Sequence, residues 1–212
     1  MNIIIAGSTG LIGSLLLKRL ASHELTLVGR RANSGAPANS KQLIGDTADW
    51  PGLMAGVRCD VAICTLGTTM AQAGSKAAFA AVDHDAVIAI AKAAKADGAR
   101  QFMMVSSVGA NAKASNFYLA TKGKAEEDIK ASGFDRVDIF RPGLLRGERG
   151  GKTRPVERLM IGLSPITNLL TPRLFDHYRA IDAGDVAGAV ASLVGKAGHG
   201  AFVHHNREMW TP

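Results

Sequence analysis

The sequence predicts one α/β domain built on a doubly wound parallel β-sheet, and three observations carry this prediction. The chain of 212 residues is long enough to bury a proper core and short enough to form a single unit. Short apolar runs rich in β-branched residues recur along it, as buried parallel strands require. Segments with helical spacing alternate with these runs, and strands that alternate with helices build parallel sheets.

The chain opens with an expected strand, glycine turn and helix. Residues 2–6 are an apolar run, Gly7, Gly10 and Gly13 follow in the spacing G-x-x-G-x-x-G, and residues 14–20 have a helical pattern. Gly7 would make the tight turn, Gly10 would let the backbone approach a pyrophosphate, and Gly13 would let the helix pack closely on the strand. Free N–H groups at the start of the helix favour negative charge there.

This order of elements is the context that a dinucleotide-binding loop requires, so the sequence predicts a Rossmann-like fold. A glycine-rich turn that binds nothing is the alternative. The residues assigned to the cofactor-binding loop are Gly7, Ser8, Thr9, Gly10, Leu11, Ile12 and Gly13.

Two arginines follow the second expected strand, which covers residues 25–29. In dinucleotide folds the end of this strand reaches the adenosine ribose, where an acidic residue binds the 2′-hydroxyl of NAD and an arginine pairs with the 2′-phosphate of NADP. Arg30 and Arg31 occupy this position without an acidic residue, and a guanidinium matches a phosphate bidentately. The sequence therefore predicts a preference for NADP(H) over NAD(H). Two solvated charges at the start of a loop are the alternative.

Two further strand ends supply candidate cofactor contacts. Asp46 ends an expected third strand at residues 41–46, where it would accept from the adenine amino group or cap the following segment. The fourth strand, residues 60–65, ends at Leu66, Gly67 and Thr68. Ligands in open α/β sheets bind outside the carboxyl ends of the strands, so these three residues would line the cofactor. An ordinary tight turn is the alternative.

The fifth expected strand, residues 101–107, ends at Ser106 and Ser107, and Tyr118 and Lys122 follow on a helix. Residues at positions i and i+4 lie on one helix face, so the lysine ammonium would stabilise the tyrosine phenolate. The tyrosine is then a proton donor near neutral pH, and a serine hydroxyl from the strand end would polarise a substrate carbonyl. A chance match of tyrosine and lysine spacing is the alternative.

The remaining elements complete the expected sheet. A long alanine-rich helix is expected over residues 75–96, with Asp83, His84 and Asp85 as structural or cofactor-loop contacts. The sixth strand, residues 134–140, precedes a Pro-Gly turn whose backbone would bind the nicotinamide amide through Gly143 or Leu144. The residues assigned to this turn are Pro142, Gly143 and Leu144. Residues 144–180 would form a lid or substrate region, followed by a helix at 185–194 and a last strand at 200–203.

The composition of the chain bears on whether it binds nucleic acid, a membrane or a metal ion. The net charge is +7, but the basic residues are scattered and aromatic residues are few, so no nucleic-acid surface is expected. No apolar stretch has the length of a membrane span, and the amino-terminal run lacks the basic flank of a signal peptide. These observations predict a cytoplasmic protein. No metal site is expected, because Cys59 and Cys64 lack ligand spacing and the adjacent His204 and His205 would point to opposite faces of a strand.

These motifs together resemble the atypical branch of the short-chain dehydrogenase/reductase superfamily. The chain is most similar to the Tat-interacting-protein-like oxidoreductases of that branch, over about residues 2 to 150. The shared motifs are the glycine turn, the serine-ended fifth strand, Tyr118-x-x-x-Lys122, Arg141-Pro142-Gly143, and residues 28–31, 64–69, 115–119 and 122–126. The resemblance implies a catalytic set of Ser107, Tyr118 and Lys122. In the superfamily the tyrosine is the acid/base, the lysine also holds the nicotinamide ribose, and the second serine of the pair usually positions the carbonyl.

Three hypotheses of function follow. The first is an NADP(H)-dependent oxidoreductase that transfers hydride between nicotinamide and a small carbonyl or alcohol substrate. The second is an NADP(H)-binding regulatory or redox-sensing protein with little turnover, which the regulatory members of the family suggest. The third is an isomerase or epimerase with a tightly held cofactor. An oligomer and a protein partner are compatible with each of them.

Overall fold

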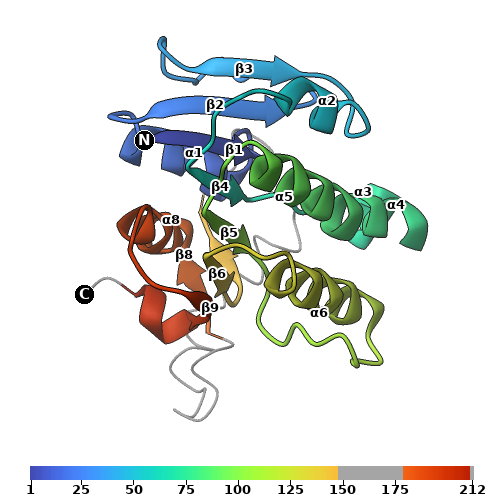
Figure 1. Cartoon of the computed structure of the whole chain (residues 1–212). Coiled ribbons are helices and arrows are strands. Elements are labelled where there is room, and N and C mark those ends of the chain that lie inside the picture. Colours follow the sequence, from blue (N-terminus) through green and yellow to red (C-terminus); the bar gives the residue numbers. More distant parts are fainter. Residues whose placement is uncertain (148–178, 211–212) are drawn as a thin grey trace.

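The computed structural model describes residues 1–147 and 179–210, so most of the expected lid region lies outside the described residues. Its centre is a sheet of seven parallel strands in the order β3-β2-β1-β4-β5-β6-β9 (Figure 1). The strands are β1 (Asn2–Ala6), β2 (Glu24–Gly29), β3 (Lys41–Ile44), β4 (Val61–Cys64), β5 (Gln101–Val105), β6 (Arg136–Arg141) and β9 (Gly200–His205). This architecture confirms the predicted Rossmann-like, doubly wound sheet in one domain.

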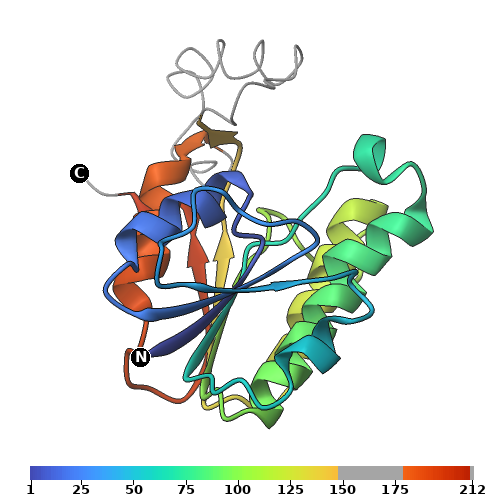
Figure 2. The same cartoon turned by 90° about the horizontal axis from the view of Figure 1, so that it is seen from above.

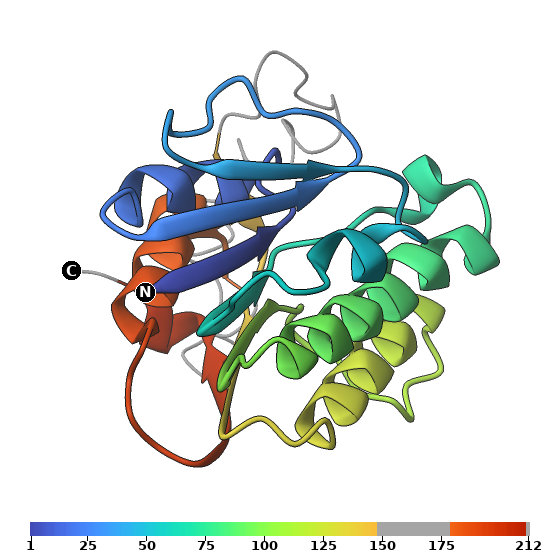
Figure 3. The ribbon, with the colours of Figure 1, turned by 45° about the horizontal axis from the view of Figure 1, so that its top comes forward.

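Helices cover both faces of the sheet. The helices α1 (Leu11–Arg19) and α8 (Ala183–Leu193) lie side by side on one face, as Figure 2 shows. The opposite face carries α2 (Trp50–Met54), α5 (Ala86–Ala96) and α6 (Phe117–Lys130), which lie together in Figure 3. Within residues 1–147 and 179–210, none of the helices combines the length and the apolar character needed to cross a bilayer.

The alternation of side chains along each strand divides the interior into two cores. Ile3 and Ile5 of β1 pack with the leucines of α1 and the valines of α8, whereas Ile4 and Ala6 pack with α2, α5 and α6. Both faces of β1 are therefore buried, and its run of three isoleucines is the pattern of a central parallel strand. Because β1 pairs with both β2 and β4, the strand order reverses beside it, and a ligand crevice opens at such a point.

The expected helix over residues 75–96 has a different form in the structure. It consists of α4 (Lys76–Ala80), a π-helical turn (Ala81–Asp85) and α5, and a short α3 (Met70–Ala73) precedes it. A π turn inserts one extra residue into the helical ladder and re-aims the side chains that follow it. Here it brings the carboxylate of Asp83 into the protein interior, where this residue has no exposed surface.

Smaller elements complete the described chain. β7 (Leu145–Arg146) pairs with β8 (Ile181–Asp182) in a separate two-stranded sheet. The last strand extends to His205 and is followed by a 3₁₀ turn (Asn206–Met209). Both cysteines are buried, and burial raises the pKa of Cys59 to about 12 and that of Cys64 to about 11.

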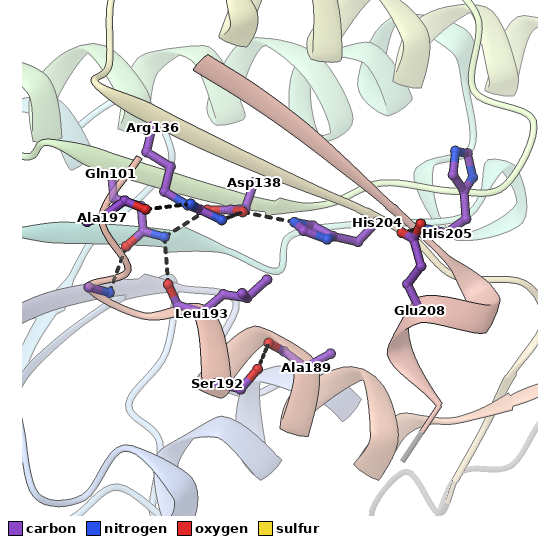
Figure 4. A network of polar contacts seen from close by, with 11 residues as sticks. Gln101, Arg136, Asp138, Ala189, Ser192, Leu193, Ala197, His204, His205 and Glu208 are labelled. Atoms are coloured by element: carbon purple, nitrogen blue, oxygen red, sulfur yellow. Dashed lines mark hydrogen bonds and ion pairs between the residues drawn. The ribbon is translucent and has the colours of Figure 1, made fainter. Parts of the chain in front are cut away.

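A buried polar network joins β5, β6, β9 and the end of α8 (Figure 4). The Asp138 carboxylate accepts from Arg136 Nε at 2.7 Å and from Gln101 Nε2 at 2.7 Å, and it lies 2.8 Å from His204 Nε2. Gln101 also donates to the Leu193 carbonyl at 2.8 Å. His204 thus points toward Asp138, whereas the side chain of His205 lies apart from it in Figure 4.

Candidate functional site

A cavity of about 350 Å³ opens at the carboxyl ends of β1, β2 and β4. Its wall consists mainly of the glycine turn after β1, the end of β2, the segment after β3 and the loop after β4, with one residue each from α3 and the π-helical turn. The lining residues are Gly7, Ser8, Thr9, Gly10, Val28, Gly29, Arg30, Arg31, Thr47, Trp50, Thr65, Leu66, Gly67, Thr68, Gln72 and Val82. The structure therefore brings the predicted glycine turn, arginine pair and Leu66–Thr68 loop together around one space.

The glycine turn is packed so closely that side chains would not fit. Gly7 has φ +87°, and a Cβ built on it would lie 2.7 Å from Thr65 Oγ1. A Cβ on Gly13 would lie 2.2 Å from the Gly7 carbonyl oxygen, and one on Gly10 would lie 3.2 Å from the same oxygen. Gly7 and Gly13 thus permit the close approach of the turn, the helix and β4.

The start of α1 offers its backbone to a ligand. Gly10 is the N-cap residue and has no side chain with which to cap the first N–H groups. The first turn carries no acidic residue, whereas Lys18 and Arg19 lie in the last turn. The uncapped N–H groups and the helix dipole make this end of α1 suited to an anion such as a pyrophosphate. Leu11 and Ile12, which the sequence assigns to the cofactor-binding loop, belong to this first turn and are not among the residues that line the cavity.

The end of β2 forms the arginine side of the cavity. Arg30 and Arg31 are both exposed and line it. Asp46 does not line the cavity, in contrast to the expectation that it would meet the adenine, and its carbonyl accepts from Asp49 N at 2.9 Å. Thr47 and the buried Trp50 line this side instead, since the short turn after β3 ends in a helix that places Trp50 against the wall.

Lys122 lies next to the loop after β4, although it is not itself one of the residues that line the cavity. Its side chain is 5% exposed, and its Nζ lies 2.8 Å from Asp83 Oδ1 in a buried ion pair. The other carboxylate oxygen of Asp83 accepts from the Thr68 N–H at 2.8 Å. A Cβ built on Gly67 would lie 3.7 Å from Lys122 Nζ. The ammonium therefore lies directly behind Gly67, a residue of the cavity wall.

Ser106 and Ser107 have different surroundings. Ser106 is buried and its Oγ donates to Glu126 Oε1 at 2.5 Å, which turns this hydroxyl toward α6. Ser107 is only partly buried, and its Oγ has a long contact of 3.3 Å with the Val108 carbonyl oxygen. Of the two serines, Ser107 keeps the hydroxyl with greater access to solvent.

Glu126 connects the ends of three elements around this serine pair. It is 1% exposed, and besides Ser106 it accepts from Arg141 Nε at 2.9 Å. Arg141 ends β6, Ser106 follows β5, and Glu126 lies one helical turn after Lys122 on α6. This carboxylate holds the helix that carries Tyr118 and Lys122 against the ends of β5 and β6.

Tyr118 lies in the first turn of α6, where Asn116 is the N-cap and its Oδ1 accepts from Leu119 N at 3.1 Å. Its ring packs against Phe79 of α4 with a centroid separation of 5.5 Å. The loop between β5 and α6 crosses this helix at Gly123, where a Cβ would lie 2.2 Å from the Ala112 N. Tyr118 and Lys122 thus share one helix face, beside the loop that begins with Ser107.

The turn after β6 uses some of the backbone groups expected to bind nicotinamide. The Gly143 N–H donates to Asn206 Oδ1 at 2.9 Å, and the Leu144 carbonyl accepts from Ile181 N at 2.9 Å. The Pro142 carbonyl accepts from Val108 N at 3.0 Å. These bonds fix the turn beside the Ser107 loop, and they occupy the Gly143 N–H and the Leu144 carbonyl with protein partners.

From the sequence, Asp83 is expected only as a structural or cofactor-loop contact, and Glu126 is not assigned to the site. Their signals are an acidic residue within an alanine-rich helix and a carboxylate four positions after Lys122. The basic residues Arg149, Lys152 and Arg154 of the expected lid region lie outside the described residues. In the described ranges, no three His, Cys, Asp or Glu side chains gather closely enough to hold a metal ion.

The chain is similar to known proteins in sequence over most of its length. Residues 7–164 match a family of NAD(P)H-binding proteins. Protein fmp52, mitochondrial, of Aspergillus niger is 30% identical over 220 residues, covering 99% of this chain and 93% of the relative. The Candida albicans protein of the same name is 39% identical over 158 residues, covering 70% of this chain and 69% of the relative.

Solved structures share the fold. UDP-glucose 4-epimerase of Thermus thermophilus in complex with NAD has a TM-score of 0.71 at 15% identity, covering 97% of this chain and 78% of that one. The Bordetella bronchiseptica enzyme WbmH in complex with NAD⁺ has a TM-score of 0.68 at 17% identity, covering 96% and 75%. At these identities the likeness concerns the architecture of the sheet and its helices.

The expected cytoplasmic location is wrong by comparison with these relatives, which are named as mitochondrial proteins. Composition and the absence of a signal-peptide pattern could not distinguish the two compartments, because a mitochondrial protein also folds as an α/β domain without a membrane span. The match across residues 7–164 and the relatives together place the chain in the NAD(P)H-binding family, and this membership agrees with the fold shared with these NAD-bound structures.

Proposed function

We propose that the chain is an NADP(H)-dependent oxidoreductase that acts on a small carbonyl or alcohol substrate, with Tyr118 as its acid/base. The observation that supports this most directly is the position of Lys122. Its ammonium lies against Gly67 in the wall of a cavity that the glycine turn and the arginine pair line elsewhere. The residues proposed for proton transfer would therefore adjoin the cavity that would bind the phosphates.

The residues of the cavity fit a dinucleotide. Only glycine fits at positions 7 and 13, where the turn, α1 and β4 pack closely on one another, and the uncapped start of α1 suits a pyrophosphate. Arg30 and Arg31 would pair with an adenosine 2′-phosphate, which is the basis for preferring NADP(H). Gly67, Thr68 and Lys122 would hold the nicotinamide side. The cofactor, when bound, supplies or accepts the hydride.

Residues of the chain would donate the proton and bind the substrate oxygen. In the reducing direction the Tyr118 hydroxyl gives its proton to the oxygen of the carbonyl that becomes an alcohol. The Lys122 ammonium stabilises the resulting phenolate, and solvent returns the proton to it. The Ser107 hydroxyl donates to the same substrate oxygen and orients the carbonyl. Asp83 is a positioning residue, because it touches Lys122 and the Thr68 backbone.

The test is a screen of small aldehydes and ketones with NADPH, followed on any substrate by Tyr118→Phe. We expect the variant to lose kcat by on the order of 100- to 10,000-fold, the usual contribution of a general acid, while NADPH affinity stays close to that of the wild type. Full turnover in Tyr118→Phe contradicts the assigned role. NADPH binding with no tyrosine-dependent turnover on any substrate favours a regulatory or redox-sensing protein.

A further inference from the structure

A side chain links the loop after the arginine pair to the glycine turn. Asn33 Nδ2 donates to the Ser8 carbonyl oxygen at 3.0 Å and lies 3.4 Å from Ser8 Oγ. Ser8 is 5% exposed and lines the cavity. Asn33 follows Arg31 by two positions, so its amide connects the two segments that enclose the arginine side of the cavity.

Asn33 is itself held from two further directions. Its N–H donates to Gln42 Oε1 at 2.8 Å, and its carbonyl accepts from Gln42 Nε2 at 3.3 Å. Its Oδ1 accepts from Gly35 N at 2.9 Å. Both backbone groups and both amide atoms of Asn33 thus have protein partners. The residue is fixed by β3, by its own loop and by the glycine turn.

This fixation bears on the two arginines that precede it. Their side chains are exposed and long, and ordering such side chains on a phosphate costs conformational entropy. The backbone of Arg30 and Arg31 runs between two fixed residues. Gly29 is held in the sheet as the last residue of β2, and Asn33 is held by its hydrogen bond to the Ser8 carbonyl. A backbone anchored at both ends restricts where the guanidinium groups can lie and lowers the cost of their pairing with a phosphate.

We infer that Asn33 is a positioning residue that determines the preference of this cavity for a dinucleotide with a 2′-phosphate. Its amide has no free polar group for the cofactor, so it acts through Arg30 and Arg31. The inference rests on the proposed function, because it assumes that the cavity binds a nicotinamide dinucleotide and that the arginines meet the 2′-phosphate.

The test compares the dissociation constants of NADPH and NADH for the full chain, freed of bound nucleotide, by calorimetry. The two ligands differ only in the 2′-phosphate, so general damage to the site weakens both alike, whereas loss of the arginine geometry weakens NADPH alone. We expect Asn33→Ala to weaken NADPH about five- to tenfold, the effect of one lost hydrogen bond, and to leave NADH nearly unchanged. Gln42→Ala should likewise weaken the binding of NADPH relative to that of NADH.

A matched control and a combined variant sharpen the result. Asn39→Ala removes the same side chain from an exposed position of the same loop and should alter neither affinity. Adding Asn33→Ala to Arg30→Ala/Arg31→Ala should not change the ratio of the NADPH and NADH dissociation constants any further. The reason is that Asn33 acts through the two arginines, which the double variant has already removed. The inference is overturned if Asn33→Ala keeps the wild-type ratio of the NADPH and NADH dissociation constants, or if it weakens the binding of both nucleotides equally. Either result leaves the proposed function intact. Equal affinity of the wild type for both nucleotides overturns the NADP(H) preference and the inference together.

Discussion

The buried pair of Asp83 and Lys122 shows how one residue shapes the candidate site. A buried charge without a partner is costly, so each member of the pair requires the other. The same carboxylate accepts from Thr68 N, which couples the lysine to the loop of the cavity wall. The π turn is the local deviation that makes this contact, since an uninterrupted α-helix would direct residue 83 differently.

Removing one member of this pair should destabilise the fold strongly. We expect Asp83→Ala to lower the free energy of unfolding by about 3 to 5 kcal/mol, because it leaves the Lys122 ammonium buried and unpaired. Urea denaturation followed by circular dichroism measures this change. The combined variant Asp83→Ala/Lys122→Met should recover much of the loss, since it removes both charges. A single variant as stable as the wild type would show that the pair is not buried in solution.

At the scale of single elements, α1 depends on the glycines that precede and begin it. The Gly13 backbone contacts the Gly7 carbonyl where a Cβ would overlap it, whereas the space near Gly10 is only tight. Thr65 Oγ1 donates to the Ala6 and Gly7 carbonyls at 3.1 Å each, so β4 holds the turn from the other side. Displacement of α1 would therefore alter both the phosphate-binding end of the helix and its packing on the sheet.

Alanine substitutions of these glycines should reduce stability most where there is least space for a Cβ. Gly13→Ala should cost about 1 to 3 kcal/mol of stability through overpacking, and it should weaken NADPH binding as α1 moves. Gly10→Ala should have a smaller effect, because its Cβ would lie 3.2 Å from the Gly7 oxygen, compared with 2.2 Å for that of Gly13. Gly52→Ala is the control, with no atom within 4 Å of its Cβ. If Gly13→Ala matched Gly52→Ala in thermal denaturation and in NADPH titration, the close packing of α1 would be refuted.

Much of the architecture was predictable from the sequence, because it depends on local patterns. The isoleucine run of β1 and the glycine spacing after it determine a strand, a turn and a helix without reference to distant residues. The recurrence of such runs predicts the parallel sheet, and its carboxyl edge predicts where Leu66–Thr68 would line a ligand. These elements were found at the predicted positions within one to three residues at their ends.

The contacts within the candidate site were much less predictable. Periodicity places Asp83 on a helix, but the π turn that directs it to Lys122 depends on tertiary packing. Likewise, Ser106 and Ser107 are equivalent in sequence, and only the position of Glu126 distinguishes them. The position of Asp46 has the same origin, since the direction of the turn after β3 decides that Trp50, rather than the aspartate, lines the cavity.

At the scale of the whole molecule, the buried network around Asp138 joins the carboxyl-terminal elements to the sheet. Burial alone would raise the pKa of Asp138, but hydrogen bonds from His204, Arg136 and Gln101 together hold it below its usual range. A carboxyl with a lower pKa in the folded than in the unfolded chain stabilises the fold at pH values above the unfolded pKa of about 4. This contribution is lost as the pH falls through the folded pKa.

The stability of the molecule should therefore depend on Asp138 in a pH-specific way. Asp138→Asn should lower the free energy of unfolding by about 2 to 4 kcal/mol at pH 7, because Arg136 loses its buried partner. The difference from the wild type should shrink as the pH falls below about 4, measured by urea denaturation at each pH. Asp135→Asn removes a surface ion pair with Arg100 nearby and should have a much smaller effect. A deficit for Asp138→Asn that is independent of pH would contradict this account.

The central claim is that the cavity between the glycine turn, the arginine pair and Lys122 binds NADP(H). Calorimetric titration of NADPH and NADH into the purified chain, freed of bound nucleotide, tests it most directly. We predict saturable binding of NADPH that is tighter than that of NADH, with the difference abolished in Arg30→Ala/Arg31→Ala. If neither nucleotide binds, the glycine turn has a structural role alone and the oxidoreductase assignment is wrong.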